Sequence, residues 1–444
     1  MSPEPAETSA SEGPCPPAIG ASSCSTSTFR ISVVAMTGAT ITIDNASATD
    51  RILSVKERVV AANRAFPVLR QQLVYRPGPH GIDPLADDVT LGGAGVAQDG
   101  SAELDVLLVD LTEAQQTKLG YELLDAVNEG HLDAMRALID QGASISFAHE
   151  YENRETALII AANRGHVDCM RLLLGAGADT EAKDADGYTA LMRAADHGHA
   201  DSVQLLLDSG AYVEARDVHG ETALIRAARS DRADCVRLLL SAGADKDVRN
   251  RSGETALMQA AHNGGSDSAQ VLLDAEVNKD SIDGHGETAL TLAAKHGGVD
   301  LVRLLIETGA NKEAKNQSGR TALIWSAVGG HVECARLLLA AGADKEARCD
   351  GGQTALMRAI CNGHADIVRL LLDAGVDKDA KNEQGGTALI WAAIFGKVEC
   401  ARLLLDAGAN KDVKDIAGRT AKEWARQMGH DDVYRLFRGA CVIA

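Results

Sequence analysis

Apolar positions recur along most of the chain with a fixed spacing of 33 residues. The triplet Thr-Ala-Leu marks each unit and begins at Thr156, Thr189, Thr222, Thr255, Thr288, Thr321, Thr354 and Thr387, with a closing Thr-Ala at Thr420. Each unit contains two short apolar runs with helical spacing, separated by a turn that usually contains glycine, and then a polar stretch with further glycines. This pattern predicts two helices and a hairpin-like turn per unit, repeated as a solenoid.

The first complete unit shows why these elements are expected. Thr156 can cap the first helix with its hydroxyl, and Gly165 can take the left-handed conformation that ends it. In the second helix, the apolar residues between Val167 and Leu174 cover one broad face that can pack against the next unit. Gly187 is expected at the tip of the following turn, where a positive φ is needed.

Two units in the middle of the array depart from this pattern. Glu276 stands where other units have the glycine that ends the second helix, and Asp231 stands where they have the glycine that ends the first. A residue other than glycine in the left-handed region costs on the order of 1 kcal/mol. We therefore expect the central repeats to be the least stable part of the array.

The period and the opening of each unit resemble the ankyrin repeat, whose usual opening is T-P-L-H-x-A. Here the opening is mostly T-A-L-[I/M/T]-x-A, so the proline and the histidine are absent. The resemblance covers 121–444 and implies an all-α solenoid with β-turn fingers, built from about ten repeats. A degenerate unit from Tyr121 to Glu155 and a polar unit from Thr420 onward are expected to be the capping repeats. Ankyrin arrays bind proteins without a common ligand, so a protein client is expected.

The chain before the repeats differs in kind. Residues 1–27 are rich in Ser, Ala and Pro and are expected to be a disordered tail. Residues 28–111 read as strand, hairpin, helix and strand, which predicts a small α+β domain. Residues 112–120 are interpreted as a linker to the repeats. The chain is therefore expected to be a multidomain protein.

The N-terminal domain resembles ubiquitin, which implies a β-grasp fold. The segments that carry the resemblance are ISVVAMTGATITI for the first hairpin, SVKERV for the helix, QQLVYRPG for the third strand and ELDVLLV for the last strand. No Gly-Gly end follows Leu111, so this domain is not expected to be a conjugated tag. The patch through which ubiquitin is recognised corresponds to Met36, Val74 and Leu107, which implies ubiquitin-binding or proteasomal proteins as partners. The alternative is that these are ordinary strand residues without a partner.

Composition narrows the function further. The formal net charge of −19 argues against a nucleic-acid binder, because that affinity depends on Lys and Arg neutralising phosphates. The sequence has no run of about 18 apolar residues, and its N-terminus lacks the basic start and apolar middle of a signal peptide. We therefore expect a cytoplasmic protein, with the nucleus as the other compartment, that does not insert into membranes.

The reactive side chains do not form a recognisable catalytic or metal site. Cys169, Cys235, Cys334 and Cys400 are separated by multiples of 33 residues, which predicts buried thiols in one repeated core position. The stretch HEYEN from His149 lacks the second histidine of a metalloprotease motif, and no nucleophile elbow or P-loop is present. No metal, cofactor or catalytic residue is therefore expected.

One position inside the repeat does not repeat. The fifth residue of T-x-L-x-x-A-A, called here the variable column, reads Ile160, Arg193, Arg226, Gln259, Leu292, Trp325, Arg358, Trp391 and Trp424. All three tryptophans of the protein lie in it. A column that accepts Arg, Gln and Trp is expected to be accessible on the concave surface that solenoids use for binding.

Trp325, Arg358 and Trp391 are expected to be neighbours in which a guanidinium lies against indole faces. Arg193 and Arg226 are expected to attract acidic side chains of the client, and the tryptophans to attract apolar ones. The residues expected to contact the client are Arg193, Arg226, Trp325, Arg358, Trp391, Ile394, Phe395 and Trp424. The alternative is that the indoles only cover the groove or stack on one another.

Three functions remain open from the sequence. The first is a non-enzymatic adaptor whose array holds a client while the ubiquitin-like domain docks on ubiquitin or proteasome machinery. The second is a plain cytosolic scaffold in which that domain has no ubiquitin-pathway role. The third is an enzyme whose site the motifs do not reveal.

Overall fold

The computed structural model describes the backbone of residues 29–34, 40–46, 74–75 and 83–84, and residues 113–149 and 153–437. Internal contacts divide the chain into two units, Met1–Gln115 and Gln116–Ala444. Each unit is described by itself.

In the first unit, strand β1 (Phe29–Val34) pairs antiparallel with β2 (Thr40–Ala46), and Ile31 lies opposite Ile43. The short strands β3 (Val74–Tyr75) and β4 (Asp83–Pro84) form a second antiparallel pair. The predicted first hairpin is therefore confirmed. The predicted helix, last strand and N-terminal tail lie outside the described residues, as do Met36 and Leu107 of the predicted patch.

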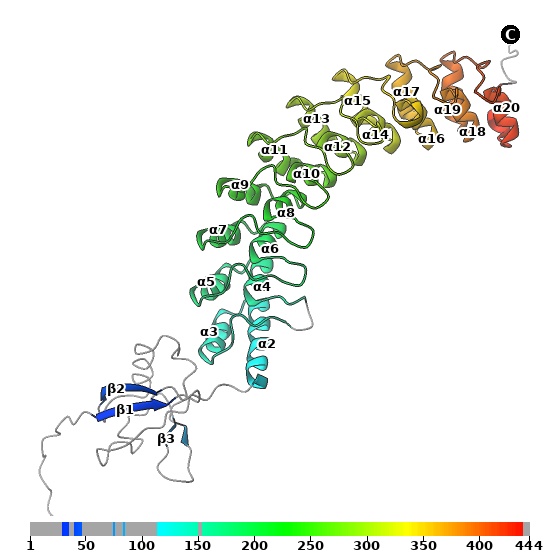
Figure 1. The fold of residues 1–444 in the computed structure, drawn as a ribbon. Helices are drawn as coiled ribbons and strands as arrows, with labels where there is room; N and C mark the ends of the chain where they lie inside the picture. The colour runs from blue at the N-terminus through cyan, green and yellow to red at the C-terminus, as the bar shows by residue number, and fades with distance from the viewer. Residues whose placement is uncertain are drawn as a thin grey trace, which may run out of the picture. The chain divides into compact units, whose positions relative to one another are not determined.

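The second unit consists of helix pairs stacked side by side (Figure 1). The first helices of the pairs are α2 (Glu113–Glu129), α4 (Ala157–Arg164), α6 (Ala190–His197), α8 (Ala223–Arg229), α10 (Ala256–Asn263), α12 (Ala289–His296), α14 (Ala322–Gly329), α16 (Ala355–Asn362), α18 (Ala388–Ile394) and α20 (Ala421–Gln427). The second helices are α3 (Leu132–Asp140), α5 (Val167–Gly175), α7 (Ala200–Asp208), α9 (Ala233–Ser241), α11 (Ser266–Asp274), α13 (Val299–Glu307), α15 (Val332–Ala340), α17 (Ala365–Asp373), α19 (Val398–Asp406) and α21 (Asp431–Leu436).

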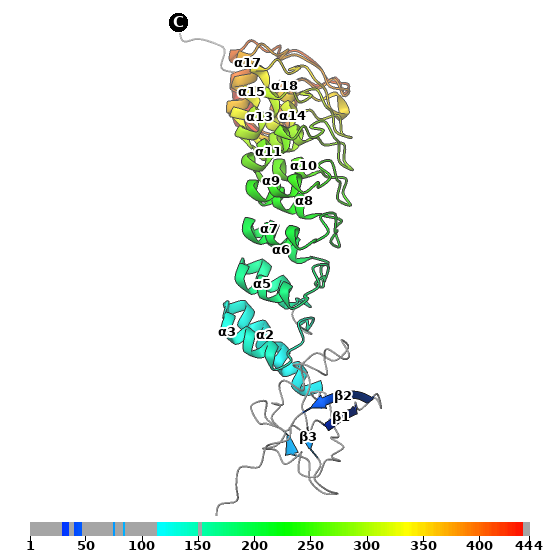
Figure 2. The ribbon, with the colours of Figure 1, turned by 90° about the vertical axis from the view of Figure 1, so that its left-hand side faces the viewer.

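The first helices form one row and the second helices another, and the rows remain separate in both views (Figures 1 and 2). Within each row, a helix contacts the equivalent helix of the next pair. The row from α4 to α20 lies on the inner side of the bend of this unit (Figure 1). This row carries the variable column, so its side chains face the concave side or the seams between repeats.

The segment predicted as a linker is part of the first repeat instead. Helix α2 begins at Glu113 and continues through 120 without a break. Leu119 packs against the core, and Leu123 and Val127 are fully buried. This spacing of four residues forms one apolar stripe along the helix, so packing against the array extends the helix over the supposed linker.

The helices begin and end as the repeat predicts. The Thr156 hydroxyl accepts a hydrogen bond from the Ile159 N–H at 3.4 Å, and Gly165 ends α4 with φ of 73°. Ala157 and Ala161 are fully buried, so their small side chains let neighbouring helices approach closely. Each repeat therefore presents a flat, small-residue face to the next.

Successive turns are also joined across the repeats. The Val218 N–H donates to the Asp186 carbonyl at 3.0 Å, and the equivalent Arg251 N–H donates to His219 at 3.0 Å. On the other side of the array, the His199 ring donates to the Asn163 carbonyl at 3.1 Å. The recurring histidines therefore tie one repeat to the previous one, which is a structural role.

Both predicted departures from glycine take the left-handed conformation. Asp231 has φ of 53° and Glu276 has φ of 56°. The Asp231 carboxylate compensates for this strain, because it accepts a hydrogen bond at 2.8 Å from the Ser268 N–H near the start of α11. Glu276 is exposed, and its side chain forms no hydrogen bond or ion pair with the described residues.

Replacing Glu276 by glycine should therefore raise the free energy of unfolding by about 0.5–1 kcal/mol, since glycine removes the left-handed strain. The measurement is chemical denaturation followed by circular dichroism. The matched control is Glu307→Gly at the end of helix α13, which should cost about 1 kcal/mol. A loss of stability in both variants would contradict the assignment of strain to Glu276.

Candidate partner-binding surface

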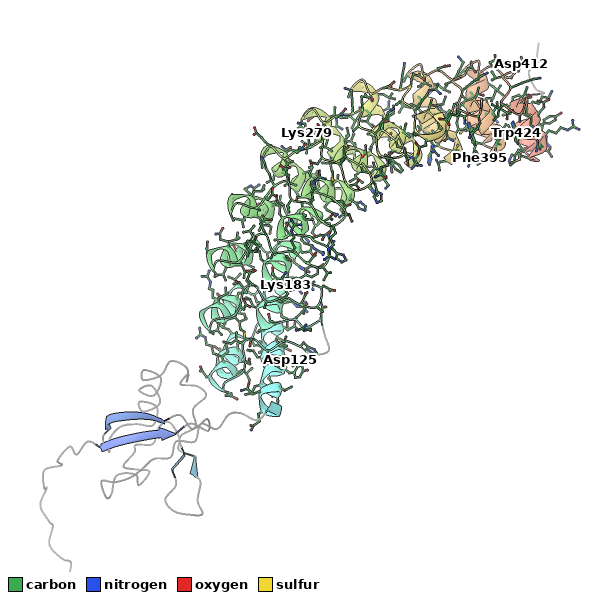
Figure 3. The ribbon with its side chains drawn as sticks, viewed as in Figure 1. Asp125, Lys183, Lys279, Phe395, Asp412 and Trp424 are labelled. Atoms are coloured by element: carbon green, nitrogen blue, oxygen red, sulfur yellow. The ribbon has the colours of Figure 1, made fainter. Side chains whose placement is uncertain are left out.

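The variable column follows the inner row of helices from α4 to α20. Figure 3 shows Phe395 and Trp424 at the C-terminal part of the array, on the side of these helices. The prediction that the whole column is accessible is wrong for its middle part. Arg226, Gln259 and Leu292 are only 2, 8 and 3% exposed. The polar residues among them are buried because the protein itself supplies their partners.

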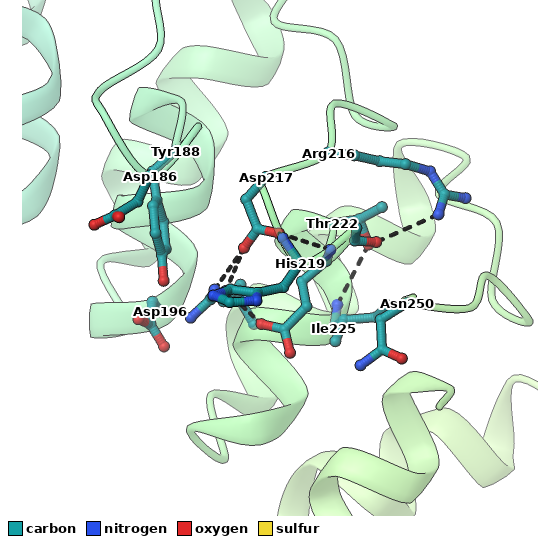
Figure 4. A network of polar contacts seen from close by, with 12 residues as sticks. Asp186, Tyr188, Asp196, Arg216, Asp217, His219, Thr222, Ile225 and Asn250 are labelled. Atoms are coloured by element: carbon teal, nitrogen blue, oxygen red, sulfur yellow. Dashed lines mark hydrogen bonds and ion pairs between the residues drawn. The ribbon is translucent and has the colours of Figure 1, made fainter. Parts of the chain in front are cut away.

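Arg226 is held by two carboxylates of the array. Figure 4 shows one of them, Asp217, and the neighbouring Tyr188. The Arg226 Nη2 lies 2.5 Å from Asp217 Oδ2, and the Arg226 Nε lies 2.6 Å from Glu221 Oε2. The Tyr188 ring of the previous repeat lies 4.3 Å from the guanidinium carbon. Asp217 is held in turn by the N–H groups of His219 and Glu221, at 2.8 and 2.9 Å. Two buried carboxylates therefore surround one buried cation.

The electrostatics of this network favour charged Arg226. Burial alone would lower the pKa of Arg226, but the hydrogen bond to Asp217 and the charge of Glu221 raise it above its ordinary value. Arg193 is arranged in the same way, since its Nη2 lies 2.5 Å from Asp184 and 3.6 Å from Glu155. The prediction that Arg193 and Arg226 attract acidic groups of a client is therefore wrong, because carboxylates of the array already occupy both arginines.

Carboxylates of the array also accept hydrogen bonds from other members of the column. Gln259 Nε2 donates to Glu254 at 2.7 Å. Trp325 Nε1 donates to the carboxylate of Glu287, at 3.1 Å to the nearer oxygen. Glu254 and Glu287 both stand immediately before the threonine that opens a repeat. The turn therefore supplies acceptors to the helix that follows or to the next repeat.

Trp424 in the last repeat is also fixed by the array. Its Nε1 donates to Asp415 Oδ2 at 2.7 Å, and the Arg419 guanidinium lies 4.6 Å from the centroid of its ring. Burial alone would raise the pKa of Asp415, but hydrogen bonds from the Arg419 N–H and from Trp424 lower it overall. Trp424 is therefore held as part of the capping repeat.

Between Trp325 and Trp424, the column and its neighbouring turns contain buried polar atoms that are not paired. Four buried side-chain atoms in three successive repeats have no hydrogen-bond partner among the residues that the structure describes: Arg320 Nε, Gln353 Oε1, Arg358 Nε and Trp391 Nε1. We call these four residues the unpaired cluster. Buried polar atoms are nearly always paired in proteins, so such a group calls for an explanation.

An apolar surface adjoins the unpaired cluster. The rings of Trp391 and Phe395 are stacked with centroids 5.6 Å apart, and Phe395 is 45% exposed. Ile394 lies next to Phe395 in sequence and packs against the core with part of its side chain accessible. Phe395 therefore offers an exposed aromatic surface next to the unpaired cluster.

The expected contact of Arg358 with indole faces is not among the contacts of the described residues. The cations over the Trp325 ring are Arg320, at 4.4 Å, and Lys295, at 4.9 Å. Neither belongs to the variable column. The sequence reasoning missed Arg320 because it stands just before Thr321, at a position that is acidic in several other repeats.

The cysteines occupy the core position predicted for them. Cys169, Cys235, Cys334 and Cys400 are buried and free. Burial raises the pKa of Cys235 and of Cys334 to about 11, so both remain protonated thiols near neutral pH. Cys349, which lies outside this series, is buried as well.

The described residues contain no group of three or more His, Cys, Asp or Glu side chains placed to hold a metal ion. Within the same part of the chain, no helix combines the length and apolar character needed to cross a lipid bilayer.

Comparison with known families gives one match. The model of the ankyrin repeats, which contains three copies of the repeat, matches residues 123–217, 224–316, 257–349, 311–382 and 356–442. A search of curated proteins finds no match. The matched segments span most of the chain and coincide with the stacked helix pairs. The chain therefore belongs to the ankyrin-repeat family.

Proposed function

We propose that the protein is a non-enzymatic interaction protein whose array binds a protein client on its concave side, between Trp325 and Trp424. The observation that carries this proposal is the change along the variable column. Arg226 is enclosed by carboxylates of the array, whereas Arg358 and Trp391 have unpaired buried donors beside exposed Phe395. The first arrangement is complete without a partner, and the second is not.

The chemistry of this region suits a protein partner. Tryptophan and arginine are among the residues most enriched at interface hot spots, especially where they are largely shielded from water. Trp391 is partly buried and held by its stack on Phe395, so little side-chain freedom remains to be lost on binding. A client segment with a large apolar side chain can bury Phe395 and cover the indole of Trp391.

Affinity capture with a matched pair of variants tests this proposal. Phe395→Ser removes the exposed ring near the unpaired cluster, and Ile416→Ser removes an apolar side chain that is 78% exposed in the turn before α20. We expect a set of proteins to be captured by the wild type and by Ile416→Ser, and to be lost from Phe395→Ser. Loss from Ile416→Ser alone would place the binding surface on the turns.

We also propose that the N-terminal unit docks on ubiquitin-related or proteasomal proteins through Met36, Val74 and Leu107. The antiparallel pairing of β1 with β2 supports this, because a hairpin opens the order of elements expected for a ubiquitin-like domain. Val74→Ala in the full chain should lose proteasomal or ubiquitin-binding proteins from the captured set while retaining the client of the array. If no such proteins are captured by the wild type, the protein is a scaffold without this second role.

A further inference from the structure

The repeats follow a rule for pairing the variable column. The donor in the column pairs with a carboxylate at one of two turn positions. The first position lies five residues before the threonine that opens a repeat, and the second lies one residue before it. Asp217 and Glu221 serve Arg226 from these two positions. Asp415 serves Trp424 from the first position. Glu287 serves Trp325 from the second position of the preceding repeat.

The repeat of Arg358 has lost both carboxylates. The first position holds Cys349 and the second holds Gln353. Cys349 is buried and has no carboxylate to offer, and the Gln353 amide oxygen has no partner among the described residues. The Arg358 side chain forms no ion pair or hydrogen bond with the described residues, and its buried Nε is left unpaired.

Trp391 in the next repeat has also lost its carboxylate. Gln353 holds the position relative to Trp391 that Glu287 holds relative to Trp325, and the Gln353 Oε1 and Trp391 Nε1 atoms are both unpaired among the described residues. Asn382 stands where Asp415 stands in the last repeat. Its Oδ1 accepts from the Gly386 N–H at 2.8 Å, and its Nδ2 donates to Gln384 at 3.0 Å. An amide group thus replaces the carboxylate oxygen that would accept from the indole. Gly386 occupies the second turn position and has no side chain to offer.

Arg320 adds a second cation that forms no ion pair with the described residues. It stands one repeat before Gln353, in the same relation to Arg358 that Tyr188 has to Arg226. The Tyr188 ring lies 4.3 Å from the Arg226 guanidinium, so we infer from the equivalent stacking that Arg320 lies beside Arg358. Two neighbouring guanidinium groups without a carboxylate between them repel each other, and a bound anion would relieve that repulsion.

We propose that Arg320, Arg358 and Trp391 form a receptor for one carboxylate of the client, the side chain of an Asp or Glu residue in the bound segment. This carboxylate takes the place of the acidic residues that the turn has lost at Cys349 and Gln353. It accepts hydrogen bonds from the Arg358 guanidinium and from the Trp391 indole. The inference rests on the proposed function, because it names the chemistry that this same surface recognises.

A carboxylate fits the site better than a more highly charged anion. Elsewhere in this array, carboxylates satisfy the equivalent donors at distances between 2.5 and 3.2 Å, two of them for Arg226 and one each for Trp325 and Trp424. The chain carries a net charge of −19, which opposes the approach of polyanions. Phe395 stacks on Trp391, so the client is expected to place a large apolar residue next to the acidic one.

The three tryptophans allow a direct test on the full chain. In a spectrum that resolves the three indole N–H signals, we titrate N-acetyl-glutamate N-methylamide and compare it with the glutamine analogue and with inorganic phosphate. The Trp391 signal should shift and saturate, with a dissociation constant on the order of 10 mM for so small a ligand. The Trp424 signal should not shift, because Asp415 already accepts from it.

Two variants separate this site from a general charge effect. Arg358→Gln should abolish the shift of Trp391. Gln353→Glu restores the acidic residue that Glu221 provides for Arg226, so it should raise the midpoint of thermal unfolding and also abolish the shift. A variant with a damaged surface would lose both the shift and stability. Gln353→Glu should lose the shift and gain stability.

Several outcomes overturn the proposal. They are the absence of a saturable shift of Trp391, an equal shift with the glutamine analogue, a response to phosphate alone, and an unchanged response in Gln353→Glu. Capture experiments distinguish a failure of this inference from a failure of the proposed function. If Phe395→Ser loses the client and Gln353→Glu retains it, the concave surface binds the client but no carboxylate is recognised at Arg358.

Discussion

Replacing Arg226 by methionine should lower the free energy of unfolding by about 3–5 kcal/mol, the usual cost of removing one partner from a buried ionic network. The substitution keeps a long side chain but leaves Asp217 buried without a cation and leaves Glu221 with Arg229 alone, at 3.4 Å. Both carboxylates lie within 2.6 Å of the present guanidinium. Urea denaturation followed by circular dichroism measures the change. Protection of amides in α8 against hydrogen exchange shows whether the loss is centred there.

The same substitution at Arg358 is the control. Arg358→Met leaves no carboxylate behind and removes a buried donor that has no partner, so the change should stay below about 1 kcal/mol and can be a gain. The two residues occupy the same position of the repeat, which removes helix propensity as an explanation. Equal losses at both positions would mean that Arg358 is paired within the fold and is not free for a partner.

Trp391→Ala should weaken binding of the client by about 2 kcal/mol or more, a loss of roughly 30-fold in affinity, if this residue is a hot spot. Its indole combines a stacked aromatic surface with an unpaired N–H, so truncation removes apolar contact area and a donor together. Calorimetry with a captured client measures the effect. Lys279→Ala, in the turn between α11 and α12, is the control and should change affinity little.

A client whose affinity is unchanged by Trp391→Ala would leave this ring as packing for Phe395. Circular dichroism and the unfolding midpoint of the variant must accompany the measurement, because part of the Trp391 side chain packs against the core. A loss of affinity that follows a loss of folded protein would count against the binding role. An unchanged fold with weaker binding supports it.

The period of the sequence predicted the helix pairs because the same few residues carry the local physics in each repeat. Thr156 caps a helix and Gly165 ends it, and both interactions depend only on near neighbours in sequence. The left-handed conformation of Glu276 was predictable for the same reason, since its equivalents in other repeats are glycines. The compensation of Asp231 by the Ser268 N–H was not, because the two residues are 37 apart and meet only through stacking.

The variable column shows where sequence reasoning failed. A position that accepts Arg and Gln predicts an exposed column, yet Arg226 and Gln259 are buried because acidic residues a few positions earlier pair with them. A signal was present, since Asp184 precedes Arg193 by the same interval of 9 residues that separates Asp217 from Arg226. Arg358 lacks an acidic residue at this interval, because Cys349 stands there, and the sequence alone is enough to distinguish it from the paired arginines.

Site-specific photo-cross-linking tests the central claim, that a client binds between Trp325 and Trp424 on the concave side. A benzophenone amino acid placed at Phe395 lies next to the unpaired cluster. The same group placed at Ile416 replaces a side chain that is more exposed than Phe395 but lies in a turn outside the column. We predict cross-links to a client from position 395 and none to that client from position 416. Cross-links from 416 with none from 395 would contradict the account and assign binding to the turns.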